Sequence, residues 1–448
     1  MPPPVDRLRL LEGVLLIAAA PIWLFPSLAP PAALGAVIVM LGLWLWQWRQ
    51  GGAPILPSTP LTLTLWLWIA AVGIGVLVSA ESDLTLPKAT NLFLGLAAWR
   101  YLSLTITNRR SFLIALNAYL VIGAALILGG VLSADWSFKI SWVRALVNLL
   151  PWQTLHLPGS PTPGVHTNQL AGTLVLYLPL ALCLWLGWQP QRQRLFIRLL
   201  GLPVVALLLF LLIATQSRSG WLAALISLLI LLAARVATIR RTVWRRAVWG
   251  LCLGLLLVVG LFLSQLGPGA LSRMWTEPPR DTLVGSLTSL AFRQEVWRWA
   301  ITATTDFPAT GTGLGTFRRV VHRLYLTQIP MDYDFGHAHN MFLQVAVDTG
   351  LPGLVAYLAL LGGAFLNGGW LIRHSPPWRP VTLGLTVGLV ALHLYGLTDA
   401  IAPGAKNGLP FWLALALLGA LRQPGVNGVS QTAPALRQSV RNNNWLNR

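Results

Sequence analysis

Two histidines, His337 and His339, stand just before a long apolar stretch. The residues from Asn340 to Thr349 can form a short helix, and Pro352 suits the first turn of the helix that follows. His339 would then lie at the outer end of a helix, where an imidazole can accept a proton at neutral pH. His339 is therefore a candidate general base, although a lone histidine at a membrane interface is more often structural.

A second polar segment is the turn from Ser217 to Gly220, which separates two apolar stretches. Ser217 or Ser219 can cap the helix that begins there, and the first amide groups of that helix are unpaired donors with partial positive charge. Arg218 beside them makes a site suited to an anion such as a phosphate. The alternative is an interfacial arginine that extends to the lipid headgroups.

A third polar segment opens with Arg293 and continues into the apolar, tryptophan-bearing stretch 296–303. We expect that stretch to form a helix on the membrane surface or over the helical bundle. Glu295 can pair with Arg298 at i,i+3, which leaves Arg293 for a ligand. The glycines that follow are Gly311, Gly313 and Gly315. A dinucleotide fingerprint needs a preceding strand, so these glycines indicate a tight turn after a helix.

A metal-dependent alternative rests on Asp332 and Asp334, which stand close to His337 and His339. Oxygen and nitrogen ligands at this spacing could suit a divalent ion. Nearby carboxylates can equally orient a histidine, or pair with the arginines that precede them. Those arginines are Arg318, Arg319 and Arg323.

The elements that must position these residues are membrane helices. Hydrophobic residues make up 55% of the chain and charged residues 10%, against roughly 25% charged residues in a soluble domain. A spanning helix needs about 20 mostly apolar residues. The sequence therefore predicts an all-α, polytopic membrane bundle of about twelve transmembrane helices. They begin near Glu12, Pro31, Leu61, Asn91, Ser111, Gln169, Leu199, Gly220, Trp249, Leu351, Pro380 and Leu409.

The net charge is +19, and the basic residues that produce it are distributed in agreement with the predicted topology. Basic residues fall in alternate loops, which the positive-inside rule assigns to the cytoplasm together with both termini. This distribution disfavours a nucleic-acid partner, and the run from Arg235 to Arg246 favours anionic headgroups. Arg100 lies within a predicted span, where it indicates either a cavity or a side chain that extends to the inner surface. Cys183 and Cys252 fall inside spans, so we expect neither a disulfide nor a metal site from them.

Two long outer loops divide the predicted chain. The expected parts are transmembrane helices 1–5 in residues 1–132, a periplasmic loop at 133–168, helices 6–9 in 169–265, a large periplasmic catalytic loop with short helices at 266–340, helices 10–12 in 341–422, and a disordered cytoplasmic tail at 423–448. Long loops usually carry function.

Taken together, the three polar segments resemble the O-antigen ligase and Wzy polymerase superfamily of integral membrane glycan transferases. The family pattern of His, then Asn, Ser or Gln, nine residues, Gly, two residues and Gly fits His339, Asn340, Gly350 and Gly353 without a gap. The other two segments look like the family's arginine-bearing segments, in the same order. Weaker similarities are found at Asn168 and Asp399, where helix packing or capping is an equal alternative. The resemblance covers roughly residues 160–420.

The resemblance implies a donor glycan on undecaprenyl diphosphate and an acceptor hydroxyl on a lipid A core sugar or another glycan. Arg218 and Arg293 would hold the diphosphate, and His339 would act as the base in one inverting step, with no metal or other cofactor. Membrane lipids would surround the protein. Further substrate contacts are expected from Ser217, Ser219, Asn340, His337, Arg318, Arg319, Asn168 and Asp399.

Three alternatives remain open from sequence. A Wzy-type polymerase and a protein O-oligosaccharyltransferase would use the same motifs. A transporter of inorganic carbon or another small solute belongs to a different class. Transporters commonly show two related halves with broken helices at the midplane, whereas the polar residues of this chain cluster on one face outside the predicted bundle.

Overall fold

The computed structural model describes residues 4–136, 143–151, 166–187, 195–236, 288–327 and 335–428, with isolated residues at 140, 154–155, 329 and within 242–257 and 281–286. The first group of elements is α1 (Pro4–Leu24), η1 (Pro26–Leu28), α2 (Pro30–Arg49), α3 (Thr62–Leu77), α4 (Ser82–Thr105), α5 (Arg109–Ser133), α6 (Arg144–Val147), α7 (Thr167–Leu186), α8 (Leu195–Ala214) and α9 (Arg218–Val236). The second group is β1 (Asp281–Thr282), β2 (Gly285–Ser286), α12 (Thr288–Asp306), α13 (Phe317–Leu324), α14 (Met341–His374), η4 (Pro376–Trp378), α15 (Arg379–Tyr395), η5 (Lys406–Gly408), α16 (Leu409–Ala420) and α17 (Pro424–Asn427).

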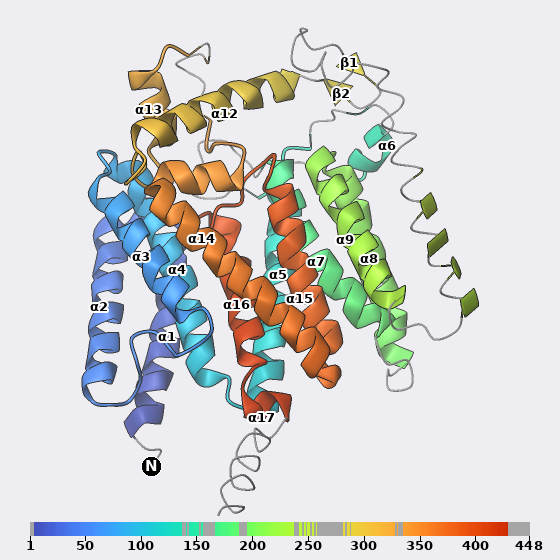
Figure 1. Ribbon diagram of the computed structural model, residues 1–448, viewed down its shortest axis with the longest axis horizontal. Helices are drawn as coiled ribbons and strands as arrows, with labels where there is room; N and C mark the ends of the chain where they lie inside the picture. The colour runs from blue at the N-terminus through green and yellow to red at the C-terminus, as the bar shows by residue number, and fades with distance from the viewer. Residues whose placement is uncertain are drawn as a thin grey trace, which may run out of the picture.

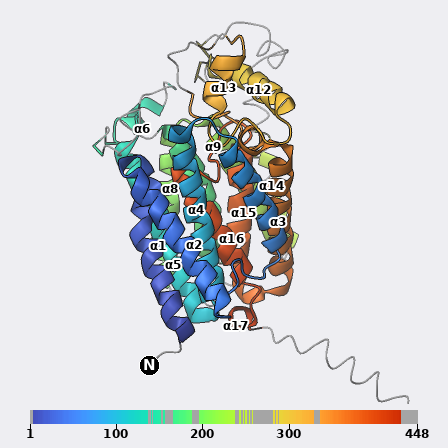
Figure 2. The same cartoon turned by 90° about the vertical axis from the view of Figure 1, so that its left-hand side faces the viewer.

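The long helices stand side by side in a bundle, and α12 and α13 lie across one end of it (Figures 1 and 2). The N-terminal end of the chain and α17 lie at the opposite end. The described residues are almost entirely helical, since β1 and β2 form only a two-stranded hairpin. The predicted all-α class is therefore confirmed, as is the predicted helix over 296–303, which lies within α12 and packs on α14.

Five described helices are long and apolar enough to cross a membrane. They are α2, α5, α7, α9 and α14, and α3 and residues Leu199–Ala214 of α8 are shorter apolar helices. Each predicted span corresponds to a described helix except the one from Trp249, which falls largely outside the described residues. The first helix begins earlier than predicted, at Pro4. The membrane class is clear from these helices, whereas the total of about twelve spans remains a prediction.

Helices α15 and α7 pack with their backbones in close contact. A Cβ atom on Gly384 would lie 2.6 Å from Leu180 Cα, and one on Gly388 would lie 2.3 Å from the Leu176 carbonyl oxygen. Small residues four positions apart let two helix backbones approach closely in a membrane. This contact fixes the position of α15, whose C-terminal end leads directly into the loop that carries Asp399.

Helix α14 is broken at Gly350, whose φ of 71° and ψ of −177° are not helical. The break frees backbone groups, and the turn after α12 satisfies them. Thr312 N donates to Val347 O at 2.7 Å, and Leu351 N donates to Pro308 O at 2.8 Å. The break confirms the predicted short helix before Thr349, and it sets a first segment, Met341 to Thr349, at an angle to the rest of α14.

Arg100 is fully buried on α4, so its side chain does not extend to the inner surface. Its guanidinium forms an ion pair with Glu12 of α1 and donates to Gln47 Oε1 of α2 at 3.0 Å. A paired and hydrogen-bonded charge can be buried at acceptable cost, whereas an unpaired one cannot. Arg100 therefore joins α1, α2 and α4 instead of extending to the surface. Cys183 is a buried free thiol, and Cys252 lies outside the described residues.

Candidate functional site

Asp399 is the centre of a cluster of charged and titratable side chains at the α12 end of the bundle. It lies in the loop between α15 and α16, and its side chain is 3% exposed. Arg293 Nη2 lies 3.7 Å from its Oδ2 atom. His337 Nε2 and His339 Nδ1 lie 3.5 and 3.7 Å from its Oδ1 atom. We call these four residues the Asp399 cluster. All four were predicted from the sequence as site residues, and they come from three separate segments.

Backbone and capping contacts bring the histidines to Asp399. Asn340 caps α14, because its Oδ1 atom accepts hydrogen bonds from the amides of Phe342 and Leu343 at 2.9 and 3.0 Å. Its Nδ2 atom donates to Leu397 O at 2.9 Å, and Met341 N donates to Gly396 O at 2.7 Å. The start of α14 is therefore fastened to the loop that carries Asp399. The side chain of Asn340, predicted to contact substrate, makes this connection.

His339 has a backbone conformation that non-glycine residues seldom adopt, with φ of 48°. Its amide donates to His337 Nδ1 at 3.1 Å, and its carbonyl accepts from Trp297 Nε1 of α12 at 3.2 Å. Left-handed backbone at such a residue costs about 1–3 kcal/mol and persists where surrounding contacts determine it. The strain is consistent with a side chain that is held in position for function.

His337 is neutral in this arrangement. Burial lowers the pKa of His337 to about 3, and the nearby charges of His339, Lys88 and His166 act in the same direction, against the opposing effect of Asp399. Because its Nδ1 atom accepts from a backbone amide, the single proton of the neutral ring is on Nε2, which faces the carboxylate. His337 therefore acts as a hydrogen-bond donor toward Asp399.

Asp399 stays ionised although it is buried. Burial alone raises the pKa of its carboxyl, but the interactions with His339, His337 and Arg293 outweigh that effect and hold the pKa well below its ordinary value. Buried polar atoms normally have hydrogen-bond partners. Within the described part of the chain, however, four buried polar atoms here lack one. They are Arg293 Nε, Gln294 Nε2, His339 Nδ1 and Asp399 Oδ2.

The turn before α9 places a second arginine near the cluster. Ser217 Oγ accepts from Gly220 N at 3.3 Å, so Ser217 caps this helix, one of the two caps predicted. Ser219 Oγ lies 3.3 Å from Ser217 Oγ. Arg218 is the first residue of α9, and the charge of Arg293 acts on it. A cation at a helix N-terminus favours an anion there.

The remaining predicted residues occupy different positions around the site. The Asn168 carbonyl, at the start of α7, accepts from Tyr395 Oη at 2.7 Å, which places this helix start beside the end of α15. Arg319 pairs with Glu81 at 3.1 Å and with Asp83 at 2.7 Å, so it attaches α13 to the start of α4 and does not join the Asp399 cluster. Arg318 is the partly buried second residue of α13.

His337, His339 and Asp399 could also hold a metal ion, because one ligand atom from each lies within 4.8 Å of the others. Two imidazoles and a carboxylate are a common donor set for transition metals. Arg293 already supplies a positive charge beside the same carboxylate, which disfavours a further cation there. The carboxylates of the metal-dependent alternative, Asp332 and Asp334, lie outside the described residues.

Several residues near the cluster were not identified from sequence. Trp297 and Gln294 follow Arg293 on α12, and Trp297 shares its face at i,i+4, a spacing that could have indicated it. Lys88 and His166 act on His337 through their charges. Lys88 could have been identified from the sequence, since it is a cation near the outer end of a predicted span. The predicted pairing of Glu295 with Arg298 is confirmed at 2.9 Å.

The fold and the site together define a helical membrane protein with a polar cluster between α12 and the end of the bundle. Residues 202–358 match the family model described as O-antigen ligase, a range that includes Arg218, Arg293, His337 and His339 and stops before Asp399. This match supports membership of the O-antigen ligase and Wzy superfamily and confirms the resemblance inferred from the motifs. No curated protein matches the chain.

Proposed function

We propose that the protein is a glycosyltransferase of the O-antigen ligase type. In this proposal it transfers a glycan from undecaprenyl diphosphate to a sugar hydroxyl of the lipid A core, on the periplasmic side of the inner membrane. The family match supports the general class. The observation that carries the specific proposal is the Asp399 cluster, where an arginine and two histidines from separate segments surround one buried carboxylate.

The two arginines bind the leaving group in this mechanism. Diphosphate leaves readily when its charge is stabilised, and guanidinium groups provide fixed donors for phosphate oxygens. The like charges of Arg218 and Arg293 act on one another, and Arg293 Nε and Gln294 Nε2 are buried donors without acceptors among the described residues. A bound diphosphate relieves the repulsion and supplies acceptors.

His339 is the general base for the acceptor hydroxyl. Its Nδ1 atom faces Asp399, which favours the tautomer with the proton on Nδ1 and leaves Nε2 free to take a proton. The separation of 3.7 Å is longer than a hydrogen bond, and such contacts commonly shorten when substrate binds. The hydroxyl attacks the anomeric carbon as the bond to the diphosphate oxygen breaks, and the proton passes to His339. A single displacement inverts the anomeric centre.

The proposed orientation places both termini in the cytoplasm and the α12 end of the bundle in the periplasm. The described basic residues Arg235 and Arg373 lie toward the ends of α9 and α14 that lead away from the cluster, as the positive-inside rule requires. No nucleotide or ATP is needed at the outer leaflet, because the donor already contains the activated bond.

Polymerase and protein-transferase activities would use the same cluster with another acceptor. The Asp399 cluster joins α12 to the loop after α15, whereas transporter sites commonly lie near the membrane midplane, so its position disfavours the transporter alternative. The acceptor is therefore the property that separates the remaining candidates.

The test uses purified protein in proteoliposomes with an undecaprenyl-diphosphate glycan and three acceptors: lipid A core, a second lipid-linked glycan, and an acceptor protein. We expect transfer to lipid A core, with large losses in His339→Ala, Arg218→Ala and Arg293→Ala. Arg298→Ala is the matched control, because it removes an exposed arginine of α12 paired only within its helix. Product made only with the lipid-linked acceptor would identify a polymerase, and equal rates for all four variants would contradict the site.

A further inference from the structure

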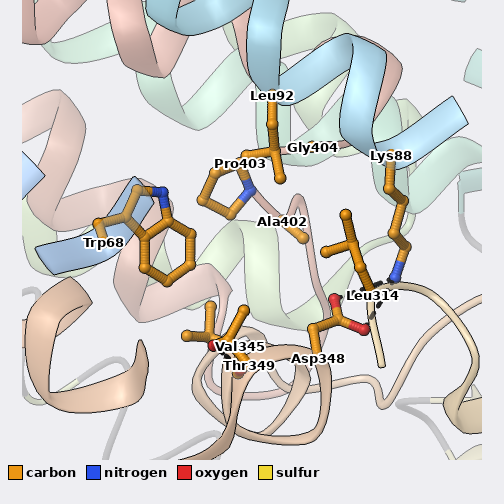
Figure 3. Close-up of a pocket in the computed structure, with 10 residues that line it drawn as sticks. All are labelled: Trp68, Lys88, Leu92, Leu314, Val345, Asp348, Thr349, Ala402, Pro403 and Gly404. Carbon is orange, nitrogen blue, oxygen red and sulfur yellow. Dashed lines mark hydrogen bonds and ion pairs between the residues drawn. The ribbon is translucent and has the colours of Figure 1, made fainter. Parts of the chain in front are cut away.

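An ion pair near the loop that carries Asp399 joins three segments of the protein. Lys88 Nζ of α4 lies 3.1 Å from Asp348 Oδ2 of α14, and the Asp348 side chain is only 6% exposed. The other carboxylate oxygen, Oδ1, accepts from Gly315 N at 2.8 Å. Figure 3 shows the lysine extending from its helix toward the carboxylate. Asp348 thus connects α4, α14 and the glycine turn that follows α12.

The pair borders a small cavity of about 20 Å³. Trp68 and Thr349 line it, and the segment from Ala402 to Gly404 covers it from the opposite side (Figure 3). A cavity of this size can hold a water molecule. The covering segment belongs to the loop that carries Asp399, so the ion pair and this loop line the same cavity.

The first segment of α14 is fixed at each of its two ends. At its start, Asn340 and Met341 are bonded to the Asp399 loop. At its end, Asp348 pairs with Lys88 and accepts a hydrogen bond from Gly315 N, and the helix breaks at Gly350. A helix of this length is a rod of roughly 12 Å at 1.5 Å per residue. A displacement at Asp348 therefore moves the other end, where His339 stands.

We propose that the ion pair between Lys88 and Asp348 is a positioning element of the transfer site, which holds the first segment of α14 so that His337 and His339 meet Asp399. Neither residue touches substrate in this proposal, which rests on the proposed function of the cluster.

A role in stability alone explains the pair less well. A buried ion pair is weak evidence for stability, because apolar residues of similar volume often serve equally well. The pair is instead supported by directional contacts, since one oxygen of Asp348 faces Lys88 and the other faces an amide of the glycine turn. A Cβ on Gly315 would lie 2.8 Å from Leu84 O of α4, so the turn itself is seated against α4.

The test compares Lys88→Met, Asp348→Asn and Lys88→Arg in the full-length protein in proteoliposomes. We expect the first two to lower kcat at least tenfold, with KM for the lipid-linked donor changed less than threefold, because the diphosphate ligands are not displaced. Lys88→Arg keeps the cation and should recover most of kcat. Arg298→Met is the matched control, since it removes an exposed ion pair from α12, and we expect its kcat to remain within twofold.

Hydrogen–deuterium exchange tests positioning separately from activity. Amides in 341–349 and 311–315 should exchange at least tenfold faster in Lys88→Met, while those of α7 remain unchanged. Wild-type kcat in Lys88→Met, or a lower kcat without faster exchange at 341–349, would overturn the inference. If the wild-type protein transfers no glycan, the proposed function fails, and the exchange result alone then decides whether the pair holds this segment.

Discussion

His339 Nδ1 lies 3.7 Å from Asp399 Oδ1, although the first residue precedes α14 and the second follows α15. The connection is built from backbone contacts, because Asn340 and Met341 bond to the two residues at the start of the Asp399 loop. The segment that matches the O-antigen ligase family ends at residue 358 and so contains only the histidine. The proposed site therefore combines residues from inside and outside the matched segment.

Replacement of His339 by Gln should lower kcat by about 10²–10⁴-fold, because a positioned base contributes on that order to proton transfer. Donor binding should change little, since the proposed phosphate ligands are arginines. The measurement is the initial transfer rate at saturating donor and acceptor, together with donor affinity. A variant that retains the wild-type rate, with the protein folded, would remove His339 from the mechanism.

Replacement of Arg293 by Lys should not preserve activity. Lysine keeps the charge but lacks the planar fork of donors that guanidinium presents to phosphate. We expect transfer to fall about 10²–10³-fold in Arg293→Ala, the usual scale for loss of one transition-state donor, with Arg293→Lys nearer to the alanine variant than to the wild type. Steady-state kinetics with the same donor decides this, and full activity of the lysine variant would show that charge alone is sufficient.

Replacement of Asp399 by Asn should lower kcat by about 10²–10⁴-fold, because the amide cannot favour the Nδ1-protonated tautomer of His339. The variant also leaves Arg293 without its carboxylate partner, so the thermal midpoint in detergent should fall as well. Asp399→Glu restores the charge and should recover part of the rate. An Asn variant that folds normally and transfers at the wild-type rate would contradict the orienting role.

His337 provides a prediction on pH. Its pKa is lowered to about 3 by burial, against about 6.5 in an unfolded chain. Between these values the unfolded chain binds more protons, so the contribution of His337 to stability is present above about pH 6.5 and is lost as the pH falls. In His337→Gln the thermal midpoint should therefore decrease less between pH 7 and pH 4 than in the wild type. Parallel curves would show that His337 titrates normally.

Replacement of Gly350 by Ala should destabilise the protein. Its φ of 71° is strained for alanine, and a Cβ there would lie 2.7 Å from the Ala309 carbonyl carbon. Such a conformation costs about 1–3 kcal/mol, before any steric overlap. Gly362 is the matched control on the same helix, since a Cβ there meets nothing within 4 Å. Thermal midpoints should fall for Gly350→Ala only, and equal midpoints would mean that the break tolerates a side chain.

The local features of the site were largely predictable from sequence. Short-range rules are sufficient for the helix before Gly350, the cap at Ser217 and the pairing of Glu295 with Arg298, because each depends on residues a few positions apart. The central position of Asp399 was not predictable in this way. It depends on how α15 packs on α7 and how Asn340 bonds to Leu397, contacts between segments that no local pattern specifies.

The same limit applies to Arg100 and to the α15 contact. Arg100 was interpreted on its own, whereas its partner Glu12 lies three helices earlier and carries no local sign of the pairing. Gly384 and Gly388 had a recognisable small-residue spacing, but their target on α7 follows only from the fold.

The pairing of Glu12 with Arg100 also constrains how the chain enters the bilayer. A single charged residue near the centre of a membrane helix opposes insertion by roughly 2.5–3.5 kcal/mol. Glu12 on α1 is synthesised well before Arg100 on α4, so its buried ion-pair partner is still missing while only the first three helices exist. We therefore expect α1 to α4 to integrate as a group, and a chain truncated after α3 should insert less efficiently than one truncated after α4.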